Sequence, residues 1–118
     1  VVELLHCKVS AGVIPCSAEV VLEMVSDKKR LSGIGFGDGP FAAFVDICSE
    51  LLDIELTILN YHDSVIGTGR DSQMQAYVEC EIGGEVYNGR GISTDIVVAG
   101  CRGFLKCVNT HIKKQKGL

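Results

Sequence analysis

The sequence lacks three patterns that would each indicate a broad class of protein. Its six cysteines include no Cys-x-x-Cys pair, so we expect reduced cysteines in the core and no metal site. No apolar run approaches 18 residues, so no membrane-spanning helix and no membrane partner are expected. Basic residues number 11 against 15 acidic ones, and the net charge of −4 argues against a nucleic-acid partner.

The start of the chain also lacks the pattern of a targeting segment. The opening VVELLHCKVS has neither a basic n-region nor a long apolar core, so no secretory signal peptide is expected. The chain opens on Val1 and not on Met, from which we expect a piece of a larger protein. Reduced cysteines predict a cytoplasmic location, or the plastid stroma if the source is a plant.

One structural pattern occurs twice along the chain. Strand-like residues, a glycine-rich turn and an apolar helix follow one another over residues 17–52 and again over residues 72–112. Hydrophobic residues at 47% and charged residues at 22% are typical of a globular chain, and a single domain is expected over residues 1–118. The repeat predicts a pseudo-symmetric ligand-binding or pairing module.

Alternation of apolar and polar residues predicts antiparallel strands. Every second residue from Met74 to Ile82 is apolar, Gly83-Gly84 fits a two-residue hairpin turn, and residues 86–92 would form the returning strand. The other strand-like segments are residues 2–14, 18–25 and 54–66, the last with a bend near Asn60.

Two apolar stretches that follow the glycine-rich segments predict helices. Asp38 is the expected N-cap of the first helix, with Pro40 in its first turn. The second helix is expected to begin at Ser93 or Thr94. Its small-residue face, which includes Gly103, predicts close approach of a partner surface, because glycine inside a helix costs about 1 kcal/mol against alanine. The expected fold is therefore α+β, two antiparallel β-rich units whose helices pack on the sheets.

Three short motifs fit catalytic or nucleotide-binding patterns only formally. Residues 37–42 match G-x-G-x-x-A, but they follow an antiparallel hairpin where a dinucleotide fold needs a parallel strand. The neighbours His62, Asp63 and Ser64 would point to alternate faces of a strand and cannot form a triad. Residues 67–72 lack the Gly-Lys-Ser/Thr of a phosphate-binding loop. We therefore expect that the chain itself is not an enzyme.

Four segments in combination resemble the C-terminal regulatory domain of 2-isopropylmalate synthase and of its relative citramalate synthase. They are GFGDGPFAAF at 35–44, LNYH at 59–62, GRDSQ at 69–73 and GISTDIVVA at 91–99. The resemblance covers nearly the whole chain.

The resemblance implies a sensor that belongs to a larger acyltransferase. The parent would carry a TIM-barrel domain that binds a divalent metal and condenses acetyl-CoA with 2-oxoisovalerate, while this domain would hold no cofactor. The domain would be a homodimer that binds leucine and gives feedback inhibition of leucine biosynthesis. Two alternatives stay open: an isoleucine-sensing domain of a citramalate synthase, and a dimerisation domain with a vestigial pocket.

The resemblance also implies an effector pocket, in which apolar side chains enclose the branched side chain of the amino acid. The helix N-termini would favour its carboxylate. Phe41-Ala42 departs from the Val-Asp that is usual in the family. The positions that match the family's pocket are Asp38, Phe41, Ala42, Ile58, Tyr61, Val65, Ser72, Met74, Ile92, Thr94 and Ile96.

Overall fold

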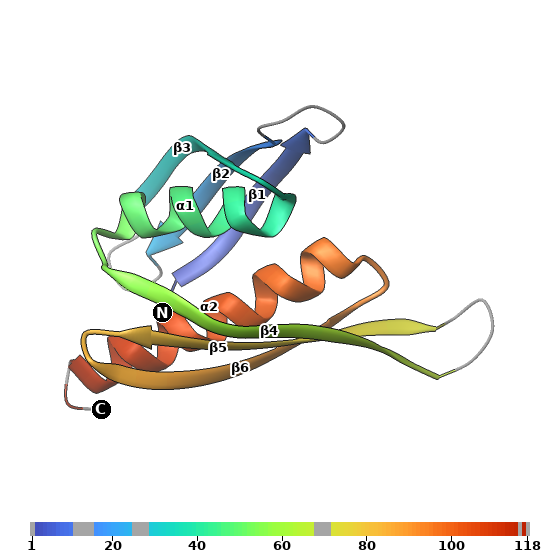
Figure 1. Cartoon of the computed structure of the whole chain (residues 1–118). Helices are drawn as coiled ribbons and strands as arrows, with labels where there is room; N and C mark the ends of the chain where they lie inside the picture. The colour runs from blue at the N-terminus through green and yellow to red at the C-terminus, as the bar shows by residue number, and fades with distance from the viewer. Residues whose placement is uncertain (1, 11–15, 25–28, 68–71, 116, 118) are drawn as a thin grey trace. The chain divides into compact units, whose positions relative to one another are not determined.

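The chain folds as two compact units, Val1–Ile54 and Glu55–Leu118. The computed structural model describes residues 2–10, 16–24, 29–67, 72–115 and 117. Each unit is a three-stranded antiparallel sheet followed by one helix (Figure 1), which confirms the α+β class. Both units begin one strand earlier than the sequence repeats suggest. The bounds of the repeats, the single regulatory domain and the homodimer stay predictions.

The first unit contains three strands in the order of the sequence. They are β1 (Val2–Ser10), β2 (Cys16–Met24) and β3 (Lys29–Gly37), and α1 (Pro40–Leu52) follows them. The central strand β2 pairs antiparallel with both neighbours. Helix α1 lies on one face of this sheet, against β3 and β2, and buries the side chains of its inner stripe. That stripe consists of Ala43, Phe44, Val45, Ile47 and Cys48.

The N-terminus of α1 differs from the sequence prediction. The N-cap is Gly39, in an extended conformation with φ −151° and ψ 171°, and no side chain caps the helix. Its carbonyl accepts a hydrogen bond from the N–H of Ala43 at 3.0 Å. The expectation that Asp38 is the cap was wrong by one residue. Pro40 at the first helical position explains the shift, because its fixed φ suits the first turn and its missing N–H needs no acceptor.

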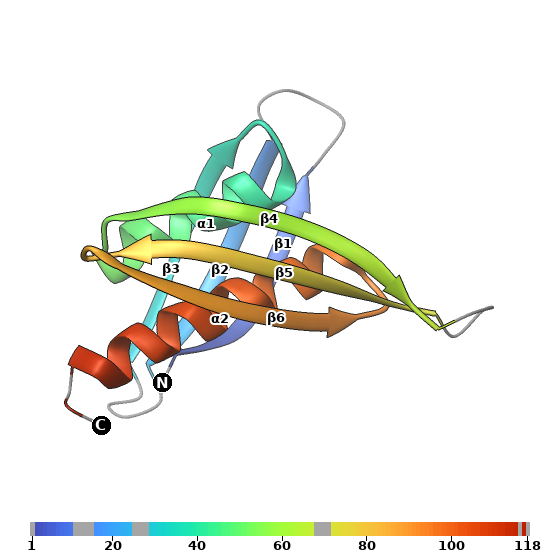
Figure 2. The ribbon, with the colours of Figure 1, turned by 60° about the horizontal axis from the view of Figure 1, so that its bottom comes forward.

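The second unit repeats this order of elements with longer strands. It contains β4 (Leu56–Ile66), β5 (Gln73–Ile82), β6 (Glu85–Ser93) and α2 (Ile96–Gln115). Helix α2 runs along one face of the sheet (Figure 2). The predicted alternation on β5 is confirmed, since Ala76, Val78, Cys80 and Ile82 are buried beneath α2. The predicted hairpin is confirmed as well, with φ of 62° at Gly83 and 83° at Gly84.

The glycine-rich segment before α1 is strand β3 and not the turn that the sequence suggested, whereas the strand expected over residues 86–92 is confirmed as β6. Gly35 and Gly37 lie inside β3, where a Cβ would come within 2.6 Å of the Ala43 carbonyl and 2.7 Å of the Ala43 N–H of α1. Gly91 lies inside β6, where a Cβ would collide with the Ala99 carbonyl of α2. Glycine in a strand often marks the close approach of another backbone, and both units use it to bring the helix backbone onto the sheet.

The predicted small-residue face of α2 is confirmed, and its partner lies within the same unit. Ala99, Gly100 and Gly103 are buried. A Cβ at Gly103 would lie 3.3 Å from the Gly89 carbonyl and 3.1 Å from Val78. At Gly103, the close approach that offsets the cost of a helical glycine is therefore made by β6 and β5.

Helix α2 begins at Ile96, two or three residues later than expected. The carboxylate of Asp95 accepts hydrogen bonds from the N–H groups of Val97 at 2.8 Å and Val98 at 3.3 Å. These contacts make Asp95 the N-cap, because they satisfy two donors that the first turn leaves without helical partners.

Cysteine side chains in both units are buried and form no disulfide at the four described positions, Cys48, Cys80, Cys101 and Cys107. This confirms the expectation of reduced core cysteines at these positions. The side chains of Cys7 and Cys16 lie outside the described part of the structure.

Candidate functional site

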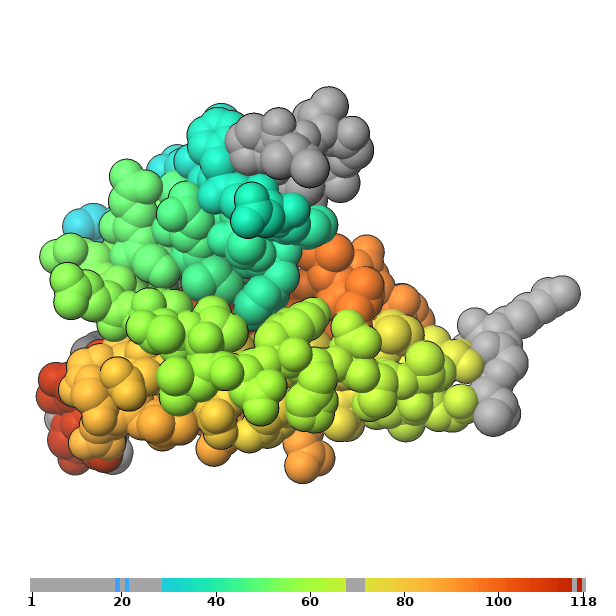
Figure 3. Space-filling view, in the orientation of Figure 1, coloured from blue at the N-terminus to red at the C-terminus, as the bar shows by residue number. Residues whose placement is uncertain are grey.

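Strand β4 carries a line of the predicted pocket residues on the side of the sheet that faces α2. Tyr61 pairs with Val78, and Ile58 pairs with Cys80, two residues that are buried beneath the helix. Because paired residues on antiparallel strands point to the same face, Ile58 and Tyr61 point to the helix side. Val65 and Met74 pair farther along and share this face. Figure 3 shows β4 (green) at the surface of the molecule, along the edge of its sheet.

A β-bulge aligns these side chains. The register of β4 against β5 shifts between Ile58 and Asn60, which leaves Leu59 as the extra residue. In a regular strand Ile58 and Tyr61 would point to opposite faces, since they lie three positions apart in the sequence. The bulge inserts one residue and returns Tyr61 to the face of Ile58. The bend that the sequence predicted near Asn60 is this bulge.

Tyr61 lies in a partly buried environment between β4 and α2. Burial raises the pKa of its phenol above the ordinary value of 10.0, and the charges of Asp63 and Cys101 raise it further. The Asp63 carboxylate shares the helix side of β4, because Asp63 pairs with the buried Ala76. Sequence reasoning did not select Asp63, although correct placement of the bulge would have put it on this face.

The pocket residues predicted near the start of α2 divide between the two faces of the sheet. Ile96 is the first residue of the helix and is half-buried, Thr94 is exposed beside it, and Ser72 is half-buried just before β5. Ile92 differs, because it pairs with Gln75 on the face away from α2, and its side chain is 42% exposed. The structure therefore does not bring the Ile92 side chain to the others, although its carbonyl accepts a hydrogen bond from Arg102 at 2.6 Å.

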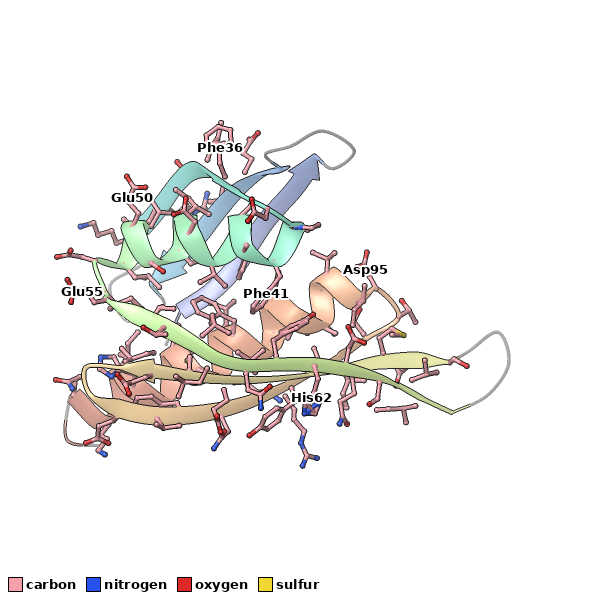
Figure 4. The ribbon with its side chains drawn as sticks, in the orientation of Figure 1. Phe36, Phe41, Glu50, Glu55, His62 and Asp95 are labelled. Carbon is pink, nitrogen blue, oxygen red and sulfur yellow. The ribbon has the colours of Figure 1, made fainter. Side chains whose placement is uncertain are left out.

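The polar groups at the start of α2 do not favour an anion. Asp95 lies at this helix terminus (Figure 4), and its carboxylate already binds the N–H groups of Val97 and Val98. The carboxylate of a ligand would meet that negative charge. The expectation that both helix N-termini attract a carboxylate is therefore not supported at α2.

Three predicted pocket residues belong to the first unit, at the start of α1. Phe41 is half-buried in the first turn (Figure 4), while Asp38 and Ala42 are exposed. At this helix start the N-cap is a glycine with no side-chain cap, in contrast to the start of α2. The membership of these three residues in the effector pocket stays a prediction.

The face of the β4-β5-β6 sheet away from α2 carries a polar and aromatic cluster. His62 stacks on Tyr77 with ring centroids 5.0 Å apart, and the Tyr77 hydroxyl donates a hydrogen bond to Asn88 at 2.7 Å. His62 and Asp63 lie on opposite faces because they pair with Tyr77 and Ala76 respectively. This arrangement confirms that the His62-Asp63-Ser64 run cannot act as a triad.

Within the described residues, no group of three His, Cys, Asp or Glu side chains lies close enough to hold a metal ion. The helices of that part of the chain are also too short or too polar to cross a bilayer.

Comparison with known protein families gives a match along most of the chain. The model of one family, described as the LeuA allosteric (dimerisation) domain, matches residues 1–112. The match spans both units.

Individual relatives are similar to the chain over only a small part of their own length. The 2-isopropylmalate synthase of Aquifex aeolicus is 32% identical over 117 residues, which cover 98% of this chain and 22% of that protein. The 2-isopropylmalate synthase of Clostridium kluyveri is 33% identical over 88 residues, which cover 75% of the chain and 17% of the relative. The enzyme of the same name from Mycobacterium leprae is 30% identical over 93 residues, which cover 79% and 15% respectively.

Proposed function

Because the chain belongs to the LeuA allosteric (dimerisation) domain family, we propose that it is the leucine-sensing and dimerisation domain of a 2-isopropylmalate synthase. The family match over residues 1–112 carries this proposal. The names of the relatives, and the small share of each that the chain covers, support its assignment to one domain of a longer enzyme. The parent would condense acetyl-CoA with 2-oxoisovalerate on a separate barrel domain that holds a divalent metal.

Leucine would bind through the line of side chains on β4 and its neighbours. Ile58, Val65, Met74 and Ile96 supply the apolar surface that a branched side chain requires, and three of them lie on the helix side of the sheet by their register. Tyr61 lies in the same line. Binding would inhibit the parent by stabilising one arrangement of the dimer, through a coupling free energy of about 1–3 kcal/mol.

Thermal unfolding of the purified chain with leucine, isoleucine or valine at equal concentrations tests the proposal. A ligand at about 100 times its Kd adds roughly 2.7 kcal/mol to the free energy of unfolding. Stabilisation by leucine alone is the expected result. Stabilisation by isoleucine alone would indicate the sensor of a citramalate synthase, and no stabilisation by any of them would leave only a dimerisation domain.

A pair of variants tells specific binding from general effects. Tyr61→Ala changes the helix side of β4 and should abolish the stabilisation by leucine. Tyr77→Ala removes the same side chain from the opposite face of the neighbouring strand and should preserve it. Equal loss in both variants would contradict the proposed pocket.

The proposed homodimer has its own measurement. Sedimentation equilibrium of the chain should give twice the mass of 12.6 kDa. A monomer at all concentrations would contradict dimerisation by this chain alone. The proposed location of the parent enzyme is the cytoplasm.

A further inference from the structure

Two buried thiols of the second unit contact each other across the interface of helix and sheet. Cys80 lies on the central strand β5 and Cys107 lies on α2, and both side chains are fully buried. The two thiols are joined by a hydrogen bond. The Cys107 sulfur also lies 3.6 Å from the carbonyl oxygen of Val78, two residues before Cys80.

The glycine contacts of the unit explain this proximity. Gly89 and Gly91 let the backbone of α2 come directly onto β6, and Gly103 lets it come onto Val78. Cys107 follows Gly103 by one helical turn, so its Cβ also lies low over the sheet. Disulfides require Cα atoms about 4.4–6.8 Å apart, a separation that bulky side chains between a helix and a sheet would prevent.

We propose that Cys80 and Cys107 form a redox-sensitive dithiol, which closes to an intramolecular disulfide that joins β5 to α2. The oxidant is a low-molecular-weight disulfide of the glutathione class. One protein thiolate attacks a sulfur of the small disulfide and releases one small thiol. The second protein thiolate then attacks the mixed disulfide and releases the other, so two protein thiols are oxidised while one small disulfide is reduced to two thiols.

The local electrostatics distinguish the two sulfurs. The hydrogen bond from Cys107 lowers the pKa of the Cys80 thiol, against the opposing effect of burial. The same hydrogen bond, together with burial, raises the pKa of Cys107. Both sulfurs are buried, so the reaction begins when α2 opens locally from the sheet and exposes them to the oxidant, and the thiolate of either one is the reactive species.

The disulfide would tie the helix to the sheet that carries the proposed leucine pocket. Cys80 pairs with Ile58 on β4 and with Tyr87 on β6. The crosslink would therefore join α2 to the middle strand of the sheet. It would raise the free energy of unfolding of the unit, because it restricts the conformations of the unfolded chain.

The test uses the full chain treated with oxidised glutathione, once in native buffer and once in urea at the start of the unfolding transition. Remaining thiols are alkylated, and tryptic peptides are mapped by mass without reduction. Trypsin separates the three cysteines concerned, because cleavage sites at Arg90, Arg102 and Lys106 lie between them. The expected product links peptide 71–90 to peptide 107–113 and has lost two hydrogen atoms, and the oxidised chain should melt at a higher temperature than the reduced one.

Variants assign the crosslink and give the opposing outcomes. Cys107→Ser and Cys80→Ala should each lose the linked peptides and the rise in melting temperature, while Cys101→Ser should keep both. Recovery of Cys80 and Cys107 as alkylated thiols under both conditions would overturn the proposal. Recovery of glutathione on either of them without a crosslink, or a crosslink to Cys101, would overturn it as well. The wild-type map decides the matter even if a variant fails to fold.

Discussion

At the scale of single residues, two aspartates that precede the two helices have different roles. Asp95 caps α2 through hydrogen bonds to two backbone N–H groups, whereas Asp38 lies one residue before the Gly39 cap of α1. Both residues fit the sequence pattern of a cap. The position of Pro40 decides the difference, since it takes the first helical position of α1.

Replacement of these aspartates should separate their effects on stability. Asp95→Ala should lower the free energy of unfolding by about 0.5–2 kcal/mol, because two N–H groups of α2 lose their acceptor. Asp38→Ala is the matched control and should change it by less than about 0.5 kcal/mol. Urea unfolding followed by circular dichroism measures both, and an equal loss in the two variants would refute the capping assignment.

The environment of Tyr61 predicts how stability depends on pH in the alkaline range. Its pKa in the folded chain is raised, first by burial and then by the charge of Asp63, so the unfolded state releases the proton at a lower pH. The Tyr61 phenol therefore makes its full contribution to the free energy of unfolding below the ordinary tyrosine pKa of about 10. This contribution is lost as the pH rises from there through the pKa of the folded chain.

Comparison with Tyr61→Phe isolates this contribution. The variant should lose less stability than the wild type when urea midpoints are measured at increasing pH from neutral to above the tyrosine range. Ultraviolet titration of the phenols should show one late-titrating group fewer in the variant. Parallel alkaline profiles for the two proteins would contradict the assignment.

At the scale of elements, glycine on the third strand determines how each helix packs. Gly35 and Gly37 of β3 face α1, and Gly91 of β6 faces α2, in each case against helix backbone. The alternate residues Ile34 and Phe36 point to the other face of β3 and are 55% and 57% exposed. Absence of a side chain is therefore required on one face of the strand only.

A single methyl group on β6 should disrupt the second unit. Gly91→Ala places a Cβ against the Ala99 carbonyl and 2.7 Å from the Gly103 N–H, and these backbone atoms cannot move independently. We expect a loss of at least about 3 kcal/mol, the upper part of the range for overpacking. Thermal unfolding measures it.

Gly39→Ala is the matched control for this substitution. Among the described residues, no atom beyond the adjacent residues of the chain lies within 4 Å of the new methyl group, and the φ of −151° suits any residue. Its effect should be several times smaller than that of Gly91→Ala. If Gly91→Ala lost no more stability than this control, the close packing of α2 on β6 would be wrong.

At the scale of the whole molecule, the proposed effector residues come from both units. Asp38, Phe41 and Ala42 belong to the first unit, and the remaining members belong to the second. The resemblance to the family predicts that the members in each unit take part in effector binding.

Hydrogen exchange with and without leucine tests whether the ligand engages both units. Saturating leucine should slow exchange at the start of α1 and along β4, since bound residues open less often. Tyr61→Ala should remove the effect along β4. Slower exchange in one unit only would restrict the pocket to that unit and remove the other residues from it.

The sequence by itself determined the elements whose signals are local. Alternation from Met74 to Ile82, the Gly83-Gly84 turn and the apolar stripes of the two helices each depend on neighbouring residues, and the structure confirms them. The family could be recognised in the same way, because its segments are short and contiguous.

Only the tertiary structure decided the features that depend on contacts between distant residues. The glycines of β3 resemble turn residues and those of β6 resemble ordinary strand positions until a helix backbone is seen to lie on them. The bulge at Leu59 changes which face Tyr61 occupies, and it exists only in the pairing of β4 with β5. The contact of Cys80 with Cys107 likewise joins residues that lie far apart in the chain, and no periodicity along a sequence records such a contact.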